Sequence, residues 1–478
     1  MHMDSSDRAF LEQVSRATFA NPFGEERWVL DAELAGTAPD ADDVVDRAVA
    51  RVAEVRERVG PMDEHTGRDR TLVEHALLFD AFHQVADDFD ALIQRQRRAT
   101  DPVPFDQHRS VARTLAAGGW PRARMGRVFE LFYQLRRGFL FIRDSLVGES
   151  ASMRTLRASL WNQLFTQDVR RYEAHLWDRM EDFSLILTGE TGTGKGAAAA
   201  ALGAAGFIGW DSKAGAFEES FERTFVPMNL SEVPGTLLES ALFGHEKGAF
   251  TGAIRKAEGA LSRCPAHGMI FLDEIGEIGP AAQVKLLRVL QERTYTPLGA
   301  ARPERFRGRV VAATHRSLTQ LREEGRFRDD FYYRLCSDVV EVPTLRVRLR
   351  EEPSELDALL EALTSRIVGN SELAPMVRDA IDRDLPTDYR WPGNVRELEQ
   401  TVRRVLVTGR CGEPDDRPRG DPFERAREGE LSARQLLDHY CAHLYAIHGT
   451  YEAVAAITEL DRRTVKKHVV ASERARSA

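Results

Sequence analysis

One short segment constrains the fold of this chain more than any other. The apolar run at residues 185–187 is followed directly by a pattern of the form G-x-x-x-x-G-K and then by an alanine-rich segment with helical spacing. Glycines in this pattern permit a tight turn whose N–H groups point at phosphate oxygens, while the helix N-terminus and the lysine add positive charge. The sequence therefore predicts a phosphate-binding loop between a buried strand and a helix. Its residues are Gly189, Glu190, Thr191, Gly192, Thr193, Gly194 and Lys195.

The residue after this loop departs from the usual pattern. Gly196 stands where many such loops carry the Ser or Thr that holds magnesium, so the metal needs another protein ligand. The apolar run at residues 269–272 ends in Asp273 and Glu274, which is the layout of a Walker B element. Asp273 would hold magnesium, usually through water, and Glu274 would polarise the attacking water. A solvated acidic pair or a plain glycine-rich turn would explain either pattern alone, but together they favour ATP and Mg²⁺ as cofactors.

The remaining apolar pattern indicates more than one domain. A chain of 478 residues is too long for a single core. Three further short apolar runs, at residues 225–228, 310–313 and 339–342, are separated by helical segments. This arrangement predicts a parallel α/β sheet with helices on both faces. The regions before residue 143 and after residue 355 show helical spacing instead.

Composition excludes several classes of protein. The formal net charge of -9 provides no global basic field for nucleic acid, so any DNA contact must be local. The four cysteines lie far apart and form no CxxC pair, which argues against a cysteine zinc site or a disulfide framework and fits a reducing compartment. No stretch approaches the roughly 18 apolar residues that a membrane helix needs, and the N-terminus lacks the layout of a signal peptide. We therefore expect a cytoplasmic protein.

The most specific motif lies in a second glycine-rich segment. Residues 248–253 read GAFTGA, in which glycines flank one aromatic and one hydroxyl residue. Such a segment suits a mobile loop that exposes Phe250 at its tip. The motif resembles the signature loop of sigma-54-dependent transcriptional activators, also called bacterial enhancer-binding proteins, of the AAA+ family. The resemblance runs from about residue 144 to residue 406 and implies that the loop contacts the sigma factor. The loop residues are Gly248, Ala249, Phe250, Thr251, Gly252 and Ala253.

The same resemblance implies roles for residues around the phosphate-binding loop. Asn229, after the apolar run at residues 225–228, matches the switch residue that holds the Walker B glutamate until ATP is sensed. Thr314 and His315 match the end of the sensor I strand, where the family more often has asparagine at the second position. All three residues are expected at the same edge of the sheet as the loop.

Three arginines match residues that act on the nucleotide in this family. Arg328 and Arg334 lie in a segment that resembles the arginine-finger region, and would reach the γ-phosphate held by a neighbouring subunit. Hydrolysis would then depend on assembly. Arg396 lies at the start of a segment that resembles the sensor II helix, and would contact the same nucleotide from the lid. Without the resemblance, the first two would be read as surface arginines paired with neighbouring aspartates.

The C-terminal region indicates a small helical unit. Residues 451–457 and 462–470 show the spacing of two short helices, and Asp461 is placed to cap the second one. With a preceding helix over residues 436–444, they resemble the Fis-like helix-turn-helix found at the end of many of these activators. The alternative is a solvated basic helix end on a small bundle. The residues that would face DNA are Arg462, Arg463, Thr464, Lys466 and Lys467.

The N-terminal region does not reveal its signal. It contains no phospho-acceptor receiver pattern and no heme, metal or nucleotide motif. Its aromatic residues are most simply core or subunit-interface residues, although a ligand pocket remains open as an alternative. The aromatic residues concerned are Phe129, Phe132, Tyr133, Phe139 and Phe141.

Together these features predict a multidomain α/β protein. The resemblance implies an ATP-dependent activator that binds upstream double-stranded DNA and, as a ring that is most often hexameric, remodels the sigma-54 RNA polymerase holoenzyme to the open promoter complex. One alternative is an AAA+ remodelling ATPase with a different protein target. Another is a regulator that has lost hydrolysis, which Gly196 and His315 leave open. The expected division is a helical regulatory region (1–143), an AAA+ α/β subdomain (144–342), a helical lid (343–408), a linker (409–430) and a helix-turn-helix domain (431–478).

Overall fold

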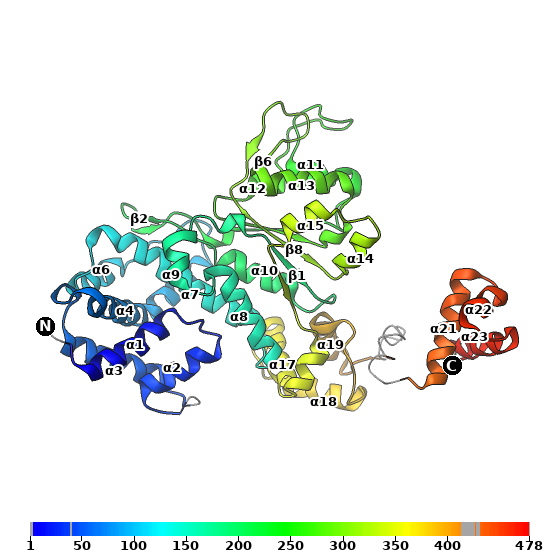
Figure 1. The fold of residues 1–478 in the computed structure, drawn as a ribbon, viewed down its shortest axis with the longest axis horizontal. Coiled ribbons are helices and arrows are strands. Elements are labelled where there is room, and N and C mark those ends of the chain that lie inside the picture. The colour runs from blue at the N-terminus through cyan, green and yellow to red at the C-terminus, as the bar shows by residue number, and fades with distance from the viewer. Residues whose placement is uncertain (1–2, 39–40, 413–425, 427–430, 478) are drawn as a thin grey trace. The chain divides into compact units, whose positions relative to one another are not determined.

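The computed structural model describes residues 3–38, 41–412, 426 and 431–477 (Figure 1). The chain forms two compact units, of which the first contains residues 1–378 and 393–403 and the second contains residues 379–392 and 404–478. Most of the expected linker at residues 409–430 lies outside the described residues. Within the described ranges, no helix has the length and apolar character that a membrane span requires.

The centre of the first unit is a five-stranded sheet in the order β4-β5-β8-β1-β9, with every neighbouring pair parallel. The sequence analysis predicted all five strands, and the structure confirms them. Because the strands are parallel, their carboxyl ends lie at one edge of the sheet. The strands are β1 (Leu185–Thr188), β4 (Phe225–Asn229), β5 (Met269–Asp273), β8 (Arg309–Thr314) and β9 (Asp338–Glu341).

Helices cover both faces of this sheet, as the continuous apolar runs require. Alternate residues of β1 enter different cores, since Leu185 and Leu187 pack in one apolar cluster and Ile186 packs in the other. The first cluster includes α7, α8 and α10, and the second includes α11, α13 and α15 (Figure 1). These helices are α7 (Met125–Ser145), α8 (Ala151–Phe165), α10 (Lys195–Ala204), α11 (Gly235–Phe243), α13 (Pro280–Glu292) and α15 (Asp329–Leu335).

The N-terminal helices form a second layer of the same unit. Helices α1–α4 enclose their own apolar cluster, whereas α5 and α6 join the cluster that reaches the sheet. The helical character that the sequence predicted for this region is confirmed. The helices are α1 (Ser5–Phe19), α2 (Glu25–Ala35), α3 (Val44–Val59), α4 (Gly67–Gln84), α5 (Ala86–Gln96) and α6 (His108–Ala117).

The described residues between β9 and residue 408 are mainly helical, and α18 and α19 each have residues in both units. Two antiparallel pairs, β2 with β3 and β6 with β7, lie outside the main sheet. The helices are α9 (Val169–Arg171), α12 (Ala260–Arg263), α14 (Leu318–Glu323), α16 (Leu345–Glu351), α17 (Glu355–Val368), α18 (Ala374–Asp384) and α19 (Asn394–Thr408). The short strands are β2 (Trp210–Asp211), β3 (Ala216–Phe217), β6 (Thr294–Tyr295) and β7 (Glu304–Arg305).

The second unit contains a three-helix cluster formed by α21 (Ala433–His448), α22 (Tyr451–Thr458) and α23 (Arg462–Ser477). Asp461 caps α23 as predicted, because its Oδ1 accepts hydrogen bonds from the N–H groups of Arg463 at 2.9 Å and Thr464 at 3.0 Å. Glu459 ends α22 in the left-handed conformation, so a non-glycine residue takes the strained position of this turn. The small core consists of Cys441, Leu444, Val454, Val465 and Val469.

A buried arginine links the N-terminal helices to the sheet layer. Arg137 of α7 is fully buried and donates to the carbonyl oxygens of Ala204 at 2.6 Å and Gly206 at 2.8 Å, at the C-terminal end of α10. Its guanidinium lies 4.3 Å from the ring centroid of Tyr133. Burial lowers the pKa of Arg137 to about 10, so the group stays charged at neutral pH and complements the negative end of the α10 dipole.

We expect Arg137→Ala to destabilise the first unit by about 3 kcal/mol, because it removes two charge-assisted hydrogen bonds and leaves a cavity. For a unit of this size, that loss lowers the melting temperature by about 4 °C. Differential scanning calorimetry measures the shift. Arg109→Ala, at an exposed position of α6, is the matched control and should change the melting temperature by less than about 1 °C. An unchanged melting temperature for Arg137→Ala would contradict this role.

Candidate functional site

The predicted phosphate-binding loop connects β1 to α10. Gly189, Gly192 and Gly194 have φ angles of 139°, 82° and 110°, which residues with a side chain rarely adopt. Lys195 begins α10, and its Nζ donates to the loop carbonyl oxygens of Gly189 at 2.7 Å and Glu190 at 2.8 Å. The loop is therefore folded around its own lysine, which is 7% exposed.

Two charged groups at this edge are desolvated. Burial lowers the pKa of Lys195, although Glu274 and Asp273 oppose the change. Burial also raises the pKa of Asp273, and the neighbouring Glu274 raises it further. Both shifts disfavour the charged forms. A nucleotide phosphate beside Lys195 and a magnesium ion beside Asp273 would each favour them, so this pair of groups fits Mg²⁺-ATP.

The Walker B glutamate is held by the histidine that follows β8. Glu274 has a left-handed backbone, with φ 58° and ψ 49°, and its Oε2 lies 2.8 Å from Nδ1 of His315. Thr314 is fully buried, and its Oγ1 accepts from the N–H of Arg316 at 3.0 Å. His315 therefore contacts the residue that is expected to polarise the attacking water.

Asn229 has different partners from those that the resemblance implies. It pairs with Asp273 in the register of β4 and β5, so it lies at the same edge as the Walker B residues. Its side-chain Nδ2 donates to Glu232 at 2.8 Å, and its Oδ1 accepts from the hydroxyl of Ser231 at 2.8 Å. In this structure the Asn229 amide therefore bonds within its own loop, while Glu274 bonds to His315.

The phosphate-binding loop is clamped to the helical segment after β9. Arg346 forms a two-pronged ion pair with Glu190, at 2.6 and 2.8 Å, which lowers the pKa of that carboxyl group. Asn394 is fully buried and donates to the Glu190 carboxylate and to the carbonyl oxygen of Thr191, both at 3.1 Å. The N–H of Arg396 donates to the loop carbonyl of Gly192 at 3.3 Å. Sequence reasoning missed Arg346 and the clamping role of Asn394, since only tertiary contact defines them.

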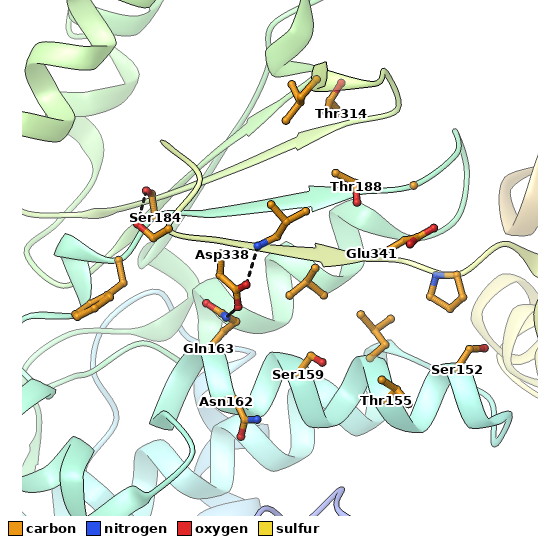
Figure 2. A pocket seen from close by; sticks show the side chains of 18 of the residues that line it. Ser152, Thr155, Ser159, Asn162, Gln163, Ser184, Thr188, Thr314, Asp338 and Glu341 are labelled. Atoms are coloured by element: carbon orange, nitrogen blue, oxygen red, sulfur yellow. Dashed lines mark hydrogen bonds between the residues drawn. The ribbon is translucent and has the colours of Figure 1, made fainter. Parts of the chain in front are cut away.

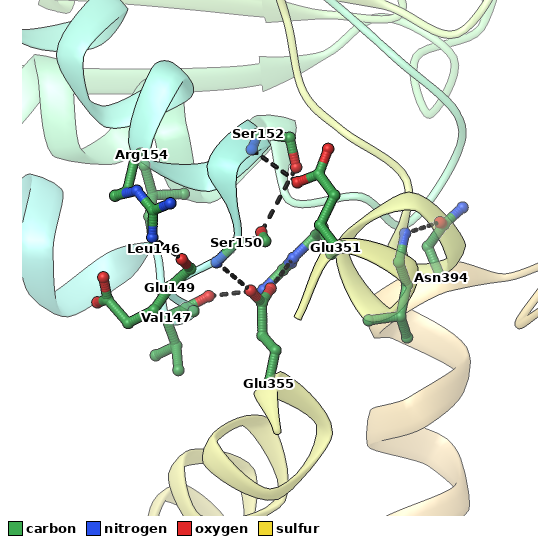
Figure 3. Close-up of polar contacts among 12 residues, drawn as sticks. Leu146, Val147, Glu149, Ser150, Ser152, Arg154, Glu351, Glu355 and Asn394 are labelled. Carbon is green, nitrogen blue, oxygen red and sulfur yellow. Dashed lines mark hydrogen bonds and ion pairs between the residues drawn. The ribbon is translucent and has the colours of Figure 1, made fainter. Parts of the chain in front are cut away.

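A second buried connection joins residues 146–150 to the start of α17 (Figure 3). Glu355 and Arg348 form an ion pair in which both residues are at most 3% exposed. Glu355 also accepts from the N–H of Ser150 at 2.8 Å, and Arg348 donates to the carbonyl oxygen of Val147 at 2.6 Å. Because each charge is satisfied by the other and by backbone groups, breaking one partner would leave a buried charge unpaired.

A cavity of about 1470 Å³ lies beside the phosphate-binding loop (Figure 2). Polar side chains of α8, including Ser159 and Gln163, form one wall, and the edge strand β9 with Glu341 lies opposite. The cavity reaches the sheet edge at Thr188 and Thr314. Of the phosphate-binding loop, only Gly189 and Glu190 border this cavity, and Lys195, Asp273 and Glu274 do not.

The GAFTGA loop is a compact turn with an accessible aromatic side chain. Gly248 and Gly252 have φ angles of 83° and 100°, and the N–H of Gly248 donates to the carbonyl oxygen of Ala253 at 2.8 Å. The ring of Phe250 is 37% exposed and packs edge-on against His245 at 5.0 Å. Thr251 is exposed beside it.

The two predicted arginine fingers bond within their own chain. Arg328 is exposed and pairs with Asp330 at 2.7 Å. Arg334 donates from Nε and Nη2 to the carbonyl oxygen of Leu290 at 3.0 and 2.9 Å. Among the described residues, neither arginine therefore bonds to the phosphate-binding loop of its own subunit.

The predicted DNA-contacting residues lie on one helix. Arg462, Arg463, Lys466 and Lys467 are exposed on α23, while Val465 and Val469 are buried as predicted. The hydroxyl of Thr464 bonds to the capping Asp461. The helix therefore presents four cations on a surface that the small core does not use.

Comparison with known proteins identifies part of the first unit. Residues 165–341 match the Sigma-54 interaction domain. The DNA-binding transcriptional regulator NtrC of Azospirillum brasilense is 36% identical over 311 residues, a match that covers 62% of this chain and 60% of that protein. The hydrogenase transcriptional regulatory protein HoxA of Bradyrhizobium diazoefficiens is 42% identical, with coverage of 53% and 48%. The Nif-specific regulatory protein of Azotobacter vinelandii is also 42% identical, with coverage of 48% and 40%.

The chain spans about half the length of these curated relatives. A solved structure of NtrX from Brucella abortus with ADP covers 77% of this chain and 80% of that one, at 21% identity and a TM-score of 0.42, a similarity too low to support a conclusion. The matched domain and the relatives agree with the GAFTGA motif and the parallel sheet. Residues 165–341 of this chain are therefore similar to the Sigma-54 interaction domain, and the matched relatives are transcriptional regulators.

Proposed function

We propose that this chain is an ATP-dependent transcription activator that remodels the sigma-54 RNA polymerase holoenzyme to the open promoter complex. The observation that carries the proposal is the GAFTGA turn, whose exposed Phe250 lies in the same matched domain as the Walker residues. An ATPase without this loop has no such apolar contact to offer a sigma factor. The proposed output is mechanical work on the polymerase, with ATP hydrolysis as its energy source.

Hydrolysis requires the residues at the sheet edge to exchange partners. Lys195 would leave the carbonyl oxygens of Gly189 and Glu190 and move its charge to the β- and γ-phosphates. Asp273 would hold Mg²⁺, which supplies charge neutralisation on the phosphates when bound. Glu274 would orient and polarise the attacking water, with His315 fixing the direction of its carboxylate. Sensor roles for Asn229, Thr314 and Arg396 belong to the same proposal.

The proposed arginine fingers make hydrolysis depend on assembly. Arg328 is exposed and paired with a solvent-accessible aspartate, so a neighbouring subunit's γ-phosphate could replace that partner at small cost. Arg334 would have to leave the carbonyl oxygen of Leu290. A closed ring, most often a hexamer in this family, provides one such neighbour for every site. The basic surface of α23 would attach the ring to upstream DNA.

Phe250→Ala is expected to abolish open-complex formation without stopping ATP hydrolysis, since the phenyl side chain lies outside the nucleotide site. Permanganate footprinting on a supercoiled sigma-54 promoter, with purified holoenzyme and ATP, should show a loss of at least about tenfold. Val284→Ala, which truncates a similarly exposed apolar residue on α13, is the matched control. ATP hydrolysis by the parent protein with no promoter opening would favour a remodeller of another target.

Arg328→Ala is expected to lower the turnover of ATP hydrolysis by about 10³-fold, because it removes a positive charge from the transition state in the next subunit. Nucleotide affinity should stay within a few-fold, as the residue does not contact ATP in its own subunit. The matched control is Arg322→Ala, which breaks a neighbouring ion pair with Asp329. A purely structural role would predict that both variants lose activity equally.

Gly196→Thr is expected to strengthen magnesium-dependent ATP binding. Apart from its chain neighbours and the backbone of its own helix, no atom lies within 4 Å of a Cβ built at Gly196, so a side chain fits there without displacing its surroundings. The added hydroxyl supplies the magnesium ligand that many such loops have. Titration of Mg²⁺ at fixed ATP should show half-saturation at a severalfold lower concentration. Gly196→Ala, which adds Cβ alone, separates this effect from the gain in helix propensity. Equal shifts in both variants would refute the coordination role.

A further inference from the structure

The N-terminal helices enclose a cavity that the proposed function does not use. Its volume is about 830 Å³, which falls within the roughly 300–1,000 Å³ typical of small-molecule sites. Residues of α1, α2, α3, α4, α7, α8 and α9 line it, and all of them belong to the first unit. None of the Walker residues or the GAFTGA residues borders it. We call it the N-terminal cavity.

Aromatic and aliphatic side chains form most of its walls. Phe23 stacks on Phe139 with centroids 5.4 Å apart, and Phe82 meets Phe132 edge-on at 5.3 Å. Phe139 and its neighbours Phe23 and Phe82 are only half-buried, although they pack against the main apolar core. They remain partly accessible because they border the cavity. The aromatic rings that line it include Phe19, Phe23, Phe82, Phe132, Phe139 and Trp161.

The aromatic residues of this region were expected to be core or interface residues. The structure shows that some of them also border the N-terminal cavity. Phe129, Tyr133 and Phe141 are buried core residues, as expected. Phe132 and Phe139 also belong to the packed region, but they border an internal space at the same time. Sequence spacing could not distinguish the two cases, because both place an apolar residue on the inner face of α7.

The polar groups in the wall are mainly hydrogen-bond donors. Five arginines line the cavity, against only two acidic residues, Asp31 and Glu149. The acidic partners of Arg136 and Arg143 are Asp90 and Asp144, neither of which is part of the lining. The lining arginines are Arg27, Arg136, Arg143, Arg154 and Arg157.

Arg27 and His83 are polar side chains of the lining that hydrogen bonds hold in fixed positions. Nε of Arg27 donates to both carboxylate oxygens of Asp31 at 2.8 Å, which holds the guanidinium in place. Nδ1 of His83 lies 2.8 Å from the carbonyl oxygen of Phe79, so this nitrogen carries the hydrogen. Burial lowers the pKa of His83 to about 4, and the nearby Arg27 lowers it further, so the ring is neutral. The charge of Arg27 is already paired with Asp31, so the excess of positive charge in the lining comes from arginines whose acidic partners lie outside it.

We propose that the N-terminal cavity binds a hydrophobic carboxylate, an organic acid whose acyl or aromatic body contacts the ring walls and whose carboxylate contacts the lining arginines. The apolar area provides most of the affinity, and the arginines select the charge of the head group. A cationic amphiphile of the same shape fits the walls but not the charge. Binding can be measured without polymerase or ATP, so this proposal stands or falls separately from the proposed function.

Helix α8 connects the N-terminal cavity to the loop at residues 146–150. Arg157 of α8 lines the cavity and also donates to the carbonyl oxygens of Leu146 at 2.9 Å and Gly148 at 2.5 Å. The same loop continues to Ser150, which bonds to Glu355 (Figure 3). Helix α8 therefore borders both cavities. Arg157 and Trp161 line the N-terminal cavity, whereas Ser159 and Gln163 line the cavity beside β9 (Figure 2).

The test uses the full chain and the fluorescent acid 11-(dansylamino)undecanoate. We expect saturable binding at one site per chain, seen as a blue shift and an increase in dansyl emission. Dodecanoate and 1-naphthylacetate should displace the probe at concentrations at least about tenfold lower than dodecylammonium and 1-(1-naphthyl)ethylammonium, since a misplaced charge costs over 1.4 kcal/mol. Equal displacement by acids and amines, or no saturable binding, would overturn the proposal.

Two variants locate the site. Leu135→Trp fills the cavity from α7, and Val45→Trp blocks it from an exposed position of α3. Because Val45 is exposed, the second variant should fold even if the first does not. Both should weaken probe binding at least about tenfold, whereas Leu237→Trp, at an exposed position of α11, should not. Thermal melting checks that each variant is folded. Binding that survives both substitutions would place the site elsewhere. A dimer in sedimentation velocity that Val45→Trp dissociates, without probe binding, would show that a second copy covers the cavity and would also overturn the proposal.

Discussion

The parallel register of the five-stranded sheet is the constraint on which the rest of the structure depends. Parallel pairing brings the carboxyl ends of β1, β4, β5 and β8 to one edge, with Thr188 opposite Thr314 and Asn229 opposite Asp273. Residues that are more than 100 positions apart in sequence thereby share one site. A shift of one residue in any strand would move its side chains to the opposite faces of the sheet and displace the polar residue at its carboxyl end from the site.

Charge pairs that span distant segments hold the surroundings of this edge. Glu190 of the phosphate-binding loop is bound by Arg346 and Asn394, and the buried pair of Glu355 with Arg348 holds the loop before α8. A buried ion pair adds little net stability relative to an apolar pair, but removing one member costs about 3–5 kcal/mol. Such pairs therefore specify geometry more than they raise the free energy of unfolding. Through Arg346 and Asn394, the helical segment after β9 is in direct contact with the phosphate-binding loop.

The two departures from the family pattern have different structural consequences. Gly196 leaves open space where a magnesium ligand would otherwise stand. His315, by contrast, makes a contact of its own, because its imidazole bonds to Glu274 while Asn229 bonds to Ser231 and Glu232. An imidazole reaches farther than an asparagine amide and can hold a carboxylate from the neighbouring strand. The departure at residue 315 is thus compatible with an ordered Walker B glutamate.

The sequence by itself determined the elements whose signal is local. Continuous apolar runs predicted all five strands, the glycine pattern predicted the phosphate-binding loop, and Asp461 predicted the start of α23, because each depends on neighbours within a few residues. The GAFTGA motif predicted the similarity to the Sigma-54 interaction domain in the same way. Only the tertiary structure decided the partners of Glu190, Glu274 and Arg137, and the existence of the N-terminal cavity. Those features join segments that are distant along the chain, and whether an apolar residue packs fully or borders an empty space depends on how neighbouring helices meet, which periodicity does not encode.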